Sequence, residues 1–359
     1  MIKPSKYVEE LTAYKITPQD VWSDSLHSDI LKLDWNESTI DFPFYKDVLI
    51  KLSHEKGLFS WYPDYLSIDL NIYISHYNNV SVNNVLSFPG SDVALETICR
   101  CYLEPNDEVV VVSPTYDNFY VYAAQVGAKI NRIDWVSATP PTIQDFSFFQ
   151  SNIEKAKLVY LVSPNNPIGY DIDILVFEAL LQNFPDILFV IDEAYVEFSS
   201  RSSLSFLTAR YNNLVVVRTF SKAFGLAGIR LGYVVANLEI INTLYKIRNG
   251  KNISMISQRL GVAALKNINV ITSWIDEVKK ARSFFEQWCI NNNIVYYPSQ
   301  GNFILFFCAD PDSLCSFLKS HGIYIRNRNA IIKGSVRVTI GSIDNVKRIV
   351  NLLEIFFKI

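Results

Sequence analysis

The segment from Thr219 to Tyr233 surrounds one lysine with hydroxyl, glycine and guanidinium groups. The amine of Lys222 can form a Schiff base with an aldehyde, while the hydroxyl of Ser221 and the cation of Arg230 suit a phosphate. Pyridoxal 5'-phosphate carries both an aldehyde and a phosphate, and its chemistry needs both kinds of partner. The segment therefore indicates a pyridoxal phosphate site, although a Ser-Lys pair taken alone is more often an ordinary solvated loop.

An aspartate closes one of the apolar runs of the chain. Asp192 follows Leu188–Ile191, and a carboxylate in so apolar a setting needs a partner for its charge. A pyridinium N–H is such a partner, and the pair would keep the ring nitrogen protonated so that the ring acts as an electron sink. The alternative interpretation is an N-cap for the following helix.

Two further polar side chains are placed to reach the phenolic oxygen of the same cofactor. The turn Ser163–Gly169 presents Asn166, and Tyr195 comes three residues after Asp192. Asparagine and proline are also common in turns for local reasons, and many tyrosines are structural core residues. Each assignment therefore depends on the others.

A helix start and an aromatic residue complete the predicted cofactor site. Ser91 and Asp92 begin the helical pattern that continues over Val93–Tyr102, and a phosphate fits the free N–H groups at such a position. Ordinary helix capping is the alternative. Tyr116 comes shortly after the next predicted strand and could stack on the pyridine ring, although an aromatic residue in this position usually belongs to the core.

The middle of the chain alternates short apolar runs with longer amphipathic stretches, which predicts an α/β fold with a mostly parallel sheet covered by helices. Because ligands in such sheets lie at the carboxyl ends of strands, we expect the polar residues after these runs to converge on one crevice. The predicted strands are Glu108–Val112, Lys157–Val162, Leu188–Ile191 and Leu214–Val217.

The chain changes character after about residue 245. An amphipathic region leads to Gly301–Phe307, a helix-like stretch at Pro311–Ser320 and a last strand at Ser335–Ile340. We therefore expect an N-terminal arm (1–40) packed on the small domain or on a partner subunit, a large cofactor-binding domain (41–245) and a smaller α/β domain (246–359).

Composition excludes several other classes of function. The chain has 359 residues, 49% of them hydrophobic, with a net charge of −3, so neither nucleic acid nor an acidic membrane surface is an expected partner. No secretory leader or membrane-spanning run is present, and we expect a cytoplasmic protein. The five cysteines and four histidines are scattered without the spacing of metal ligands, so we expect no metal site.

Taken together, these segments resemble the fold-type I pyridoxal phosphate aminotransferases, and within them the histidinol-phosphate aminotransferase family. The resemblance covers nearly the whole chain, and its matching segments occur in the family's order. They are Trp61-Tyr62-Pro63-Asp64, Gly90-Ser91-Asp92, Ser163–Gly169, Asp192-Glu193-Ala194-Tyr195 and Ser221–Tyr233.

The resemblance implies a role for each residue of the cofactor site. Lys222 would bind the cofactor covalently and shuttle a proton, and Asp192 would pair with the ring nitrogen. Asn166 and Tyr195 would hold the phenolic oxygen. It also implies a homodimer in which Tyr62 crosses to the neighbour's cofactor. The implied phosphate ligands are Ser91, Asp92, Ser221 and Arg230.

The resemblance further implies contacts to the substrate. Arg326 and Arg337 match arginines that the family uses for a substrate's phosphate or the donor's carboxylate, which suits the bidentate guanidinium. Asn36 and Tyr14 match N-terminal positions near the substrate. For each of these four residues a solvated surface position is the alternative, least so for Arg337 within an apolar strand.

Three departures from the family pattern bear on the choice of substrate. Ile168 stands where threonine is usual, Ile247–Ser254 lacks the usual proline-tyrosine pattern, and Ala13 replaces a proline. The second and third departures lie in segments that border the family's substrate pocket.

We therefore expect an aminotransferase that moves an amino group from glutamate or a similar donor to a small phosphorylated ketone. The family default is imidazole acetol phosphate, the ketone that corresponds to histidinol phosphate. One alternative is dihydroxyacetone phosphate, which would yield serinol phosphate for surface polysaccharide synthesis. A second is decarboxylation of a phosphorylated amino acid, and a cofactor-bearing protein without turnover is disfavoured because no expected catalytic position is lost.

Overall fold

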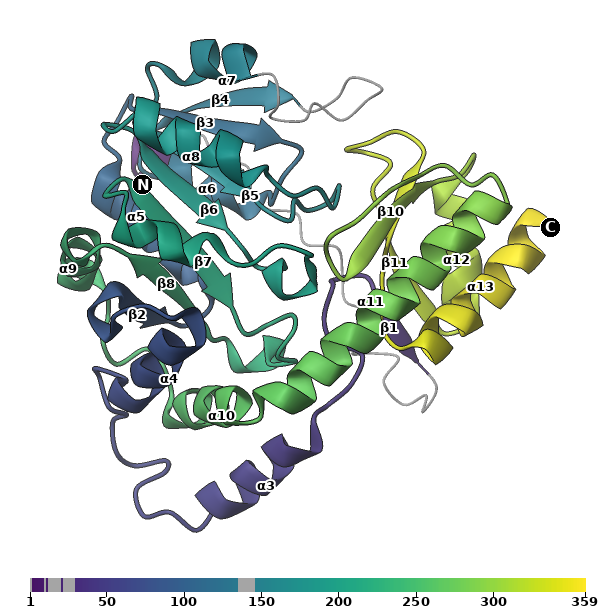
Figure 1. The fold of residues 1–359 in the computed structure, drawn as a ribbon, viewed down its shortest axis with the longest axis horizontal. Helices are drawn as coiled ribbons and strands as arrows, with labels where there is room; N and C mark the ends of the chain where they lie inside the picture. Colours follow the sequence, from purple (N-terminus) through teal and green to yellow (C-terminus); the bar gives the residue numbers. More distant parts are fainter. Residues whose placement is uncertain (1, 10, 12–20, 22–29, 135–145) are drawn as a thin grey trace.

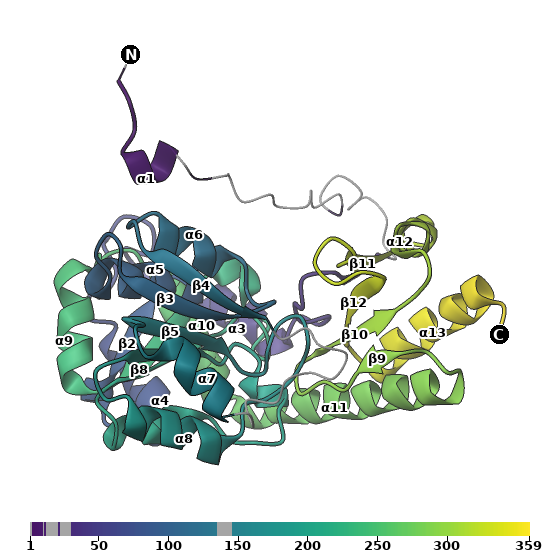
Figure 2. The ribbon, with the colours of Figure 1, turned by 90° about the horizontal axis from the view of Figure 1, so that it is seen from above.

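A computed structural model describes residues 2–9, 11, 21, 30–134 and 146–359 of the chain. It contains two β-sheets, each covered by helices, that lie side by side (Figures 1 and 2). The larger sheet is built from the first two thirds of the chain and the smaller sheet mostly from the last third. This arrangement confirms the predicted α/β fold.

The large sheet has seven strands in the order β2-β8-β7-β6-β5-β3-β4. Strand β8 is antiparallel to both of its neighbours, and the other neighbouring pairs are parallel. The carboxyl ends of all strands except β8 therefore lie at one edge. The strands are β2 (Val85–Phe88), β3 (Glu108–Ser113), β4 (Lys129–Asp134), β5 (Leu158–Val162), β6 (Leu188–Asp192), β7 (Leu214–Thr219) and β8 (Gly232–Ala236).

The central strands are apolar throughout because helices cover both faces of the sheet. In β5 the residues Leu158, Tyr160 and Val162 pack with α5, α6 and α9, whereas Val159 and Leu161 pack with α8 on the other face. The helices of this part are α3 (Pro43–Leu52), α4 (Ile68–Asn78), α5 (Ser91–Tyr102), α6 (Asn118–Ala124), α7 (Phe146–Ile153), α8 (Ile174–Asn183), α9 (Leu238–Ile247) and α10 (Met255–Lys266).

The small sheet has five strands in the order β1-β11-β12-β10-β9. Its edge strand β1 comes from the N-terminal region and pairs in parallel with β11, so residues 31–33 belong to this sheet. The short helix α1 (Lys6–Glu9) lies apart from it, over the large sheet (Figure 2). The remaining elements are β1 (Leu31–Leu33), α11 (Ile268–Asn291), β9 (Tyr296–Tyr297), β10 (Phe303–Phe307), α12 (Pro311–Ser320), β11 (Ile323–Asn327), β12 (Ser335–Thr339) and α13 (Ile343–Phe357).

The predicted strands and helices agree with the structure to within one or two residues at most ends. Three strands extend further than predicted, since β3 includes Ser113, β6 includes Asp192 and β7 includes Thr219. The predicted domain boundary at residue 245 stays a proposal. Helix α10, which follows it, packs against α4 beside the large sheet, whereas α11 packs against α13 beside the small sheet. Within the described part of the chain, every helix is too short or too polar to cross a lipid bilayer.

Candidate active site

The carboxyl edge of the large sheet gathers most of the predicted cofactor residues. Strand β2 leads to Ser91, β3 to Tyr116, β5 to Asn166, and β7 to Lys222, while β6 ends at Asp192 itself. The loop before β8 brings Arg230 to the same edge because β8 runs in the opposite direction. Residues spread over more than a hundred positions therefore meet because of the sheet's topology.

The amine of Lys222 faces the junction between the two sheets. Its Nζ donates a hydrogen bond to the carbonyl oxygen of Trp35 at 2.8 Å. The same Nζ lies 5.8 Å from the ring centroid of Tyr195. Trp35 belongs to the segment after β1, so the lysine is held between the large sheet and a segment that leaves the small sheet.

Asp192 is 3% exposed, and two groups donate hydrogen bonds to its carboxylate. The Tyr160 hydroxyl donates to Oδ2 at 3.0 Å, and the Ala194 N–H donates to Oδ1 at 3.0 Å. Burial raises the pKa of Asp192 to about 6 even though both hydrogen bonds lower it. Among the described residues no ion pair joins this carboxylate to a cation, so a positively charged hydrogen-bond donor would stabilise its ionised form.

The predicted phosphate ligands lie around the start of α5. Arg230 has a left-handed backbone (φ 53°), and its Nη2 donates to Asp92 Oδ2 at 3.1 Å. The Tyr116 hydroxyl donates to the other oxygen of Asp92 at 2.7 Å. Gly90 has a φ of 91°, which favours glycine, and a Cβ there would lie 2.7 Å from Arg230 Nη2 and displace that guanidinium.

Ser221 closes this group of phosphate ligands from the β7 side. Its side chain is buried, and its Oγ accepts a hydrogen bond from Thr219 Oγ1 at 2.9 Å. Gly232 is required nearby, because a Cβ there would lie 2.6 Å from the backbone nitrogen of Ser91. The start of α5 is thus in direct contact with the first residue of β8, which follows the loop that carries Ser221 and Arg230.

The two residues predicted to hold the phenolic oxygen have partners from the small-sheet side. The hydroxyl of Tyr195 accepts a hydrogen bond from Asn36 Nδ2 at 3.1 Å. Asn36 is fully buried in a left-handed conformation (φ 58°), and its N–H donates to Thr339 Oγ1. Asn36 is therefore buried, and the surface alternative is wrong for it.

Arg337 reaches from β12 into the same region. It is 5% exposed, and its Nη1 donates to Asn166 Oδ1 at 2.6 Å while its Nη2 donates to the Asp34 carbonyl at 2.7 Å. Its Nε is buried without a hydrogen-bond partner among the described residues. Burial, followed by the charge of Arg328, lowers the pKa of Arg337 to about 9. The surface alternative is thus wrong for Arg337 as well.

Arg326 lies directly opposite Arg337 in the antiparallel pair of β11 and β12. Its Nη1 is also buried without a hydrogen-bond partner among the described residues. Two guanidiniums with unused buried donors at one place form an arrangement that suits an anion.

Tyr62 is not brought into this group. Tyr62 is 78% exposed, and its ring contacts the Lys251 ammonium at 4.5 Å. Its predicted role requires a second copy of the chain. Tyr14 lies outside the described residues.

Sequence reasoning missed Tyr160, Trp35 and the residues that support the strand ends. Tyr160 sits within an apolar run, and only its polar atom on an otherwise apolar strand signals a function. Trp35 contributes a backbone carbonyl, which no sequence pattern reveals. Both were found only through their contacts with Asp192 and Lys222.

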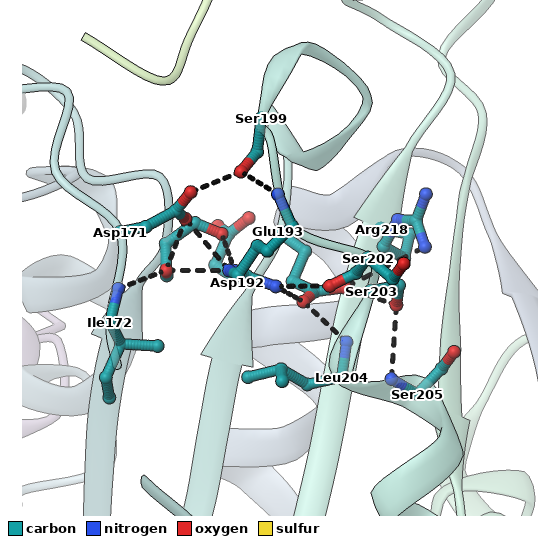
Figure 3. A network of polar contacts seen from close by, with 12 residues as sticks. Asp171, Ile172, Asp192, Glu193, Ser199, Ser202, Ser203, Leu204, Ser205 and Arg218 are labelled. Carbon is teal, nitrogen blue, oxygen red and sulfur yellow. Dashed lines mark hydrogen bonds and ion pairs between the residues drawn. The ribbon is translucent and has the colours of Figure 1, made fainter. Parts of the chain in front are cut away.

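A buried polar network supports the ends of β5 and β6 (Figure 3). The carboxylate of Glu193 is fully buried and accepts hydrogen bonds from Arg201, Ser203 and the Leu204 N–H. Arg201 also donates to Asp171 at 2.9 Å and to the Ser163 carbonyl at 2.8 Å. The network therefore fixes the residue next to Asp192 and the turn that carries Asn166.

These residues fit pyridoxal phosphate. Asp192 lacks a cationic partner where a pyridinium N–H would supply one, and Lys222 offers an amine at the same edge. The start of α5 contacts Arg230, and Ser221 lies in the same loop as Arg230, so these residues offer phosphate donors at one edge of the sheet. Nowhere in the described residues do three metal-binding side chains gather closely enough to hold a metal ion.

Comparison with known proteins agrees with this interpretation. The family described as aminotransferase class I and II matches residues 28–353. The chain is 35% identical over 366 residues to the dihydroxyacetone phosphate transaminase of Campylobacter jejuni, covering 99% of this chain and 98% of that protein. It is 31% identical over 365 residues to the histidinol-phosphate aminotransferase of a Geobacillus strain, covering 99% and 95%.

The solved structures show the same fold. The histidinol-phosphate aminotransferase of Sinorhizobium meliloti, in complex with pyridoxal 5'-phosphate, matches with a TM-score of 0.84 at 23% identity, covering 98% of this chain and 96% of that chain. The predicted fold type and family are therefore confirmed. The chain belongs to the class I and II aminotransferases, a pyridoxal phosphate-dependent family, and lies within their histidinol-phosphate aminotransferase-like group.

Proposed function

We propose that this enzyme transfers an amino group between an amino acid donor, such as glutamate, and a small phosphorylated ketone. The observation that carries this proposal is the pair Arg326 and Arg337, opposed across two strands with buried and unused N–H donors. Like charges directly opposite one another in a sheet are destabilising, so an anion that binds both would relieve a cost already built into the fold.

The cofactor supplies an electron-withdrawing ring that stabilises negative charge on the carbon beside the amine. We propose that Lys222 binds the cofactor and, once displaced by the substrate's amine, moves a proton at that carbon with its Nζ. Asp192 would keep the ring nitrogen protonated. Two observations support these roles. The Nζ of Lys222 lies at the junction of the two sheets, and the buried carboxylate of Asp192 has no cationic partner among the described residues.

Dihydroxyacetone phosphate is the acceptor that we propose first. The relative at 35% identity carries that substrate in its name, and the match covers 99% of this chain and 98% of that protein. Dihydroxyacetone phosphate and imidazole acetol phosphate share a ketone next to a phosphorylated methylene, and the arginine pair would accept either. Imidazole acetol phosphate is the second candidate, since relatives at 31% identity are histidinol-phosphate aminotransferases.

The half-reaction tests the proposal and separates the two acceptors. Serinol phosphate and histidinol phosphate are added separately to the cofactor-loaded enzyme, and loss of the absorbance of the covalently bound cofactor is followed. Conversion by serinol phosphate supports dihydroxyacetone phosphate as the acceptor, and conversion only by histidinol phosphate supports the other ketone. Conversion by neither amine, with carbon dioxide released from phosphoserine or phosphothreonine, would establish a decarboxylase instead.

We also propose a homodimer with shared active sites. Tyr62 and its neighbours Phe59 and Trp61 are 78%, 88% and 59% exposed, and large aromatic side chains exposed together favour an interface. Tyr62→Ala and Lys222→Ala should each be strongly impaired. Mixing the two under conditions that exchange subunits should restore activity, because a site with an intact lysine would then receive Tyr62 from the other chain.

The unmixed variants and the wild-type protein are the controls for this experiment. A wild-type protein that sediments as a monomer, or a mixture no more active than its components, would exclude the shared site.

A further inference from the structure

Asn36 is held in place by residues of the small sheet. It is fully buried, and its backbone N–H donates to Thr339 Oγ1 at 3.0 Å, while the Thr339 hydroxyl donates to Asn36 Oδ1 at 3.3 Å. The side chain of Asn302 donates to the carbonyl oxygen of Asn36 at 3.1 Å. The backbone and the side chain of Asn36 are thus both fixed, from the start of β10 and the end of β12.

These contacts determine which way the amide of Asn36 points. A hydroxyl carries one proton, and the Thr339 hydroxyl accepts the N–H of Asn36, so its own proton is available for Oδ1 of the same residue. With Oδ1 turned toward Thr339, the Nδ2 group faces Tyr195 and donates to its hydroxyl oxygen at 3.1 Å. Thr339 therefore sets the direction of the hydrogen bond between Asn36 and Tyr195.

This direction leaves the proton of the Tyr195 hydroxyl for a different acceptor. Tyr195 is 4% exposed, and its ring packs edge-on against Phe303 with centroids 5.0 Å apart. Within the described part of the chain, its hydroxyl accepts from Asn36 and donates to no other group. Because buried O–H groups normally have an acceptor, the position suits an oxygen atom of a ligand.

The charges around Tyr195 favour an anionic oxygen as that acceptor. Lys222 Nζ lies 5.8 Å from the ring centroid of Tyr195. Arg337 is also close, since Tyr195 is among the groups that raise the pKa of Arg337 against the larger effect of burial. The phenolic oxygen of a cofactor bound to Lys222 carries negative charge and would stand near both cations.

We propose that Asn36 is a positioning residue for the proton of Tyr195: by donating to the Tyr195 oxygen, with its amide oriented by Thr339, it directs that proton toward the phenolic oxygen of the cofactor. The inference rests on the proposed cofactor site, in which Tyr195 contacts that oxygen. It gives Asn36 a role distinct from the substrate contact that the family resemblance implies.

A donor at the phenolic oxygen has a measurable consequence. It stabilises the negative charge of that oxygen, which then attracts the proton on the nitrogen that links the cofactor to Lys222 less strongly. The pKa of this linkage is therefore lower when Tyr195 donates and higher when it does not. The pH midpoint at which the absorbance of the covalently bound cofactor changes reports this pKa, and a purely structural role would not move it.

Variants at Tyr195 and Asn36 test the direction of the hydrogen bond. Tyr195→Phe should raise the midpoint by about one pH unit, as expected for loss of a hydrogen bond to a charged group. Asn36→Asp should raise it nearly as much, because a carboxylate accepts the Tyr195 proton and turns it away from the cofactor. Asn36→Gly should raise it less, since glycine keeps the left-handed backbone (φ 58°) and only the donor is lost.

Thr339→Val repeats the test without adding a charge. The amide of Asn36 can then turn its Oδ1 toward Tyr195, so the midpoint should rise by roughly half a pH unit. Thr339→Ser keeps the hydroxyl and should retain the wild-type midpoint. Unchanged midpoints in Asn36→Asp and Thr339→Val would overturn the proposal, and Thr339→Val decides the matter if Asn36→Asp does not fold.

A double variant shows whether the effect of Asn36→Asp passes through Tyr195. Added to Tyr195→Phe, Asn36→Asp should move the midpoint much less than it does alone. Equal shifts in the two backgrounds would mean that the new carboxylate acts directly on the cofactor, and would refute the role of Tyr195. Asn78→Asp is the matched control and should leave the midpoint unchanged, since Asn78 Nδ2 donates to the Tyr233 hydroxyl at 3.0 Å in a similar buried contact between α4 and β8.

The titration also separates this inference from the proposed function. If neither phosphorylated amine reacts with the wild-type enzyme but the midpoint responds to Asn36 and Thr339 as described, the proposed substrate fails and the positioning role stands. If the amines react and the midpoint is the same in all variants, the outcome is the reverse. An unchanged midpoint in Tyr195→Phe would show that Tyr195 does not face the phenolic oxygen, which would also overturn the inference.

Discussion

Tyr160 donates a hydrogen bond to Asp192 at 3.0 Å, between the neighbouring strands β5 and β6. Both residues are buried, and the ring of Tyr160 stacks on Phe119 with centroids 3.8 Å apart. The tyrosine is thus fixed by the core on one side and holds the carboxylate on the other. This contact ties the packing of the sheet to the group that would face the cofactor's ring nitrogen.

Tyr160→Phe should therefore weaken the site without unfolding the protein, because it removes one hydroxyl and keeps the ring. A hydrogen bond to a charged group contributes about 1.5–3 kcal/mol, so we expect the half-reaction to slow about tenfold or more. The loss of a donor should also raise the pKa of Asp192 further. Stopped-flow absorbance with the amino donor measures the rate.

Tyr211→Phe is the control for this change, since the Tyr211 hydroxyl donates to Glu178 at 2.9 Å, away from the site. Equal rates in Tyr160→Phe and wild type would show that the hydroxyl does not serve the carboxylate.

The stability of the cofactor-free protein should depend on pH through Asp192. Folding raises the pKa of this group from 3.8 to about 6, so the folded state binds its proton more tightly than the unfolded state does. The associated stability is present below about pH 4 and is lost as the pH rises through about 6, amounting to about 3 kcal/mol.

The side chain in Asp192→Asn is an amide, which does not ionise in this pH range. The free energy of unfolding of this variant minus that of wild type should therefore increase by about 3 kcal/mol between about pH 4 and pH 7, because only the wild-type protein loses stability over this range. Urea denaturation of both cofactor-free proteins at several pH values measures this difference. Parallel pH profiles would contradict the raised pKa.

Lys222→Ala should abolish amino transfer, because the chain would lose the amine that binds the cofactor and moves the proton. We expect turnover to fall at least about a thousandfold and the absorbance of the covalently bound cofactor to be absent. Lys279→Ala is a control, since that lysine donates to the Ser199 carbonyl at 3.0 Å, away from the edge that carries Lys222. Full turnover in Lys222→Ala would refute the assignment.

Arg201 should be essential for stability although it lies outside the proposed set of reacting groups. Arg201→Gln leaves the fully buried Glu193 without its strongest partner, which costs about 3–5 kcal/mol in comparable buried pairs. Arg210→Gln, at an exposed pair, should cost less than about 1 kcal/mol. Chemical denaturation compares the two variants.

A double variant checks the cause. Arg201→Gln combined with Glu193→Gln should be less unstable than the sum of the single changes, because the buried charge of Glu193 is removed together with that of its partner. Strict additivity would mean that the two residues do not act through each other.

Local patterns in the sequence were enough to predict the central strands and two of the key site residues. Continuous apolar runs predicted the central strands, since strands covered on both faces cannot alternate with polar residues. Asp192 and Lys222 could be predicted because they follow such runs at the ends where ligands bind. Family motifs then linked these residues to one cofactor, because each motif is short and contiguous.

Contacts between side chains from distant parts of the chain could not be predicted in this way, because they depend on how the elements pack. Tyr160 is one of several tyrosines in apolar surroundings, and nothing local distinguishes it until β5 lies beside β6. Asn36 contacts Tyr195 only because β1 joins the small sheet through β11. Periodicity records which face of an element is buried, whereas the partner across that face depends on how the elements pack.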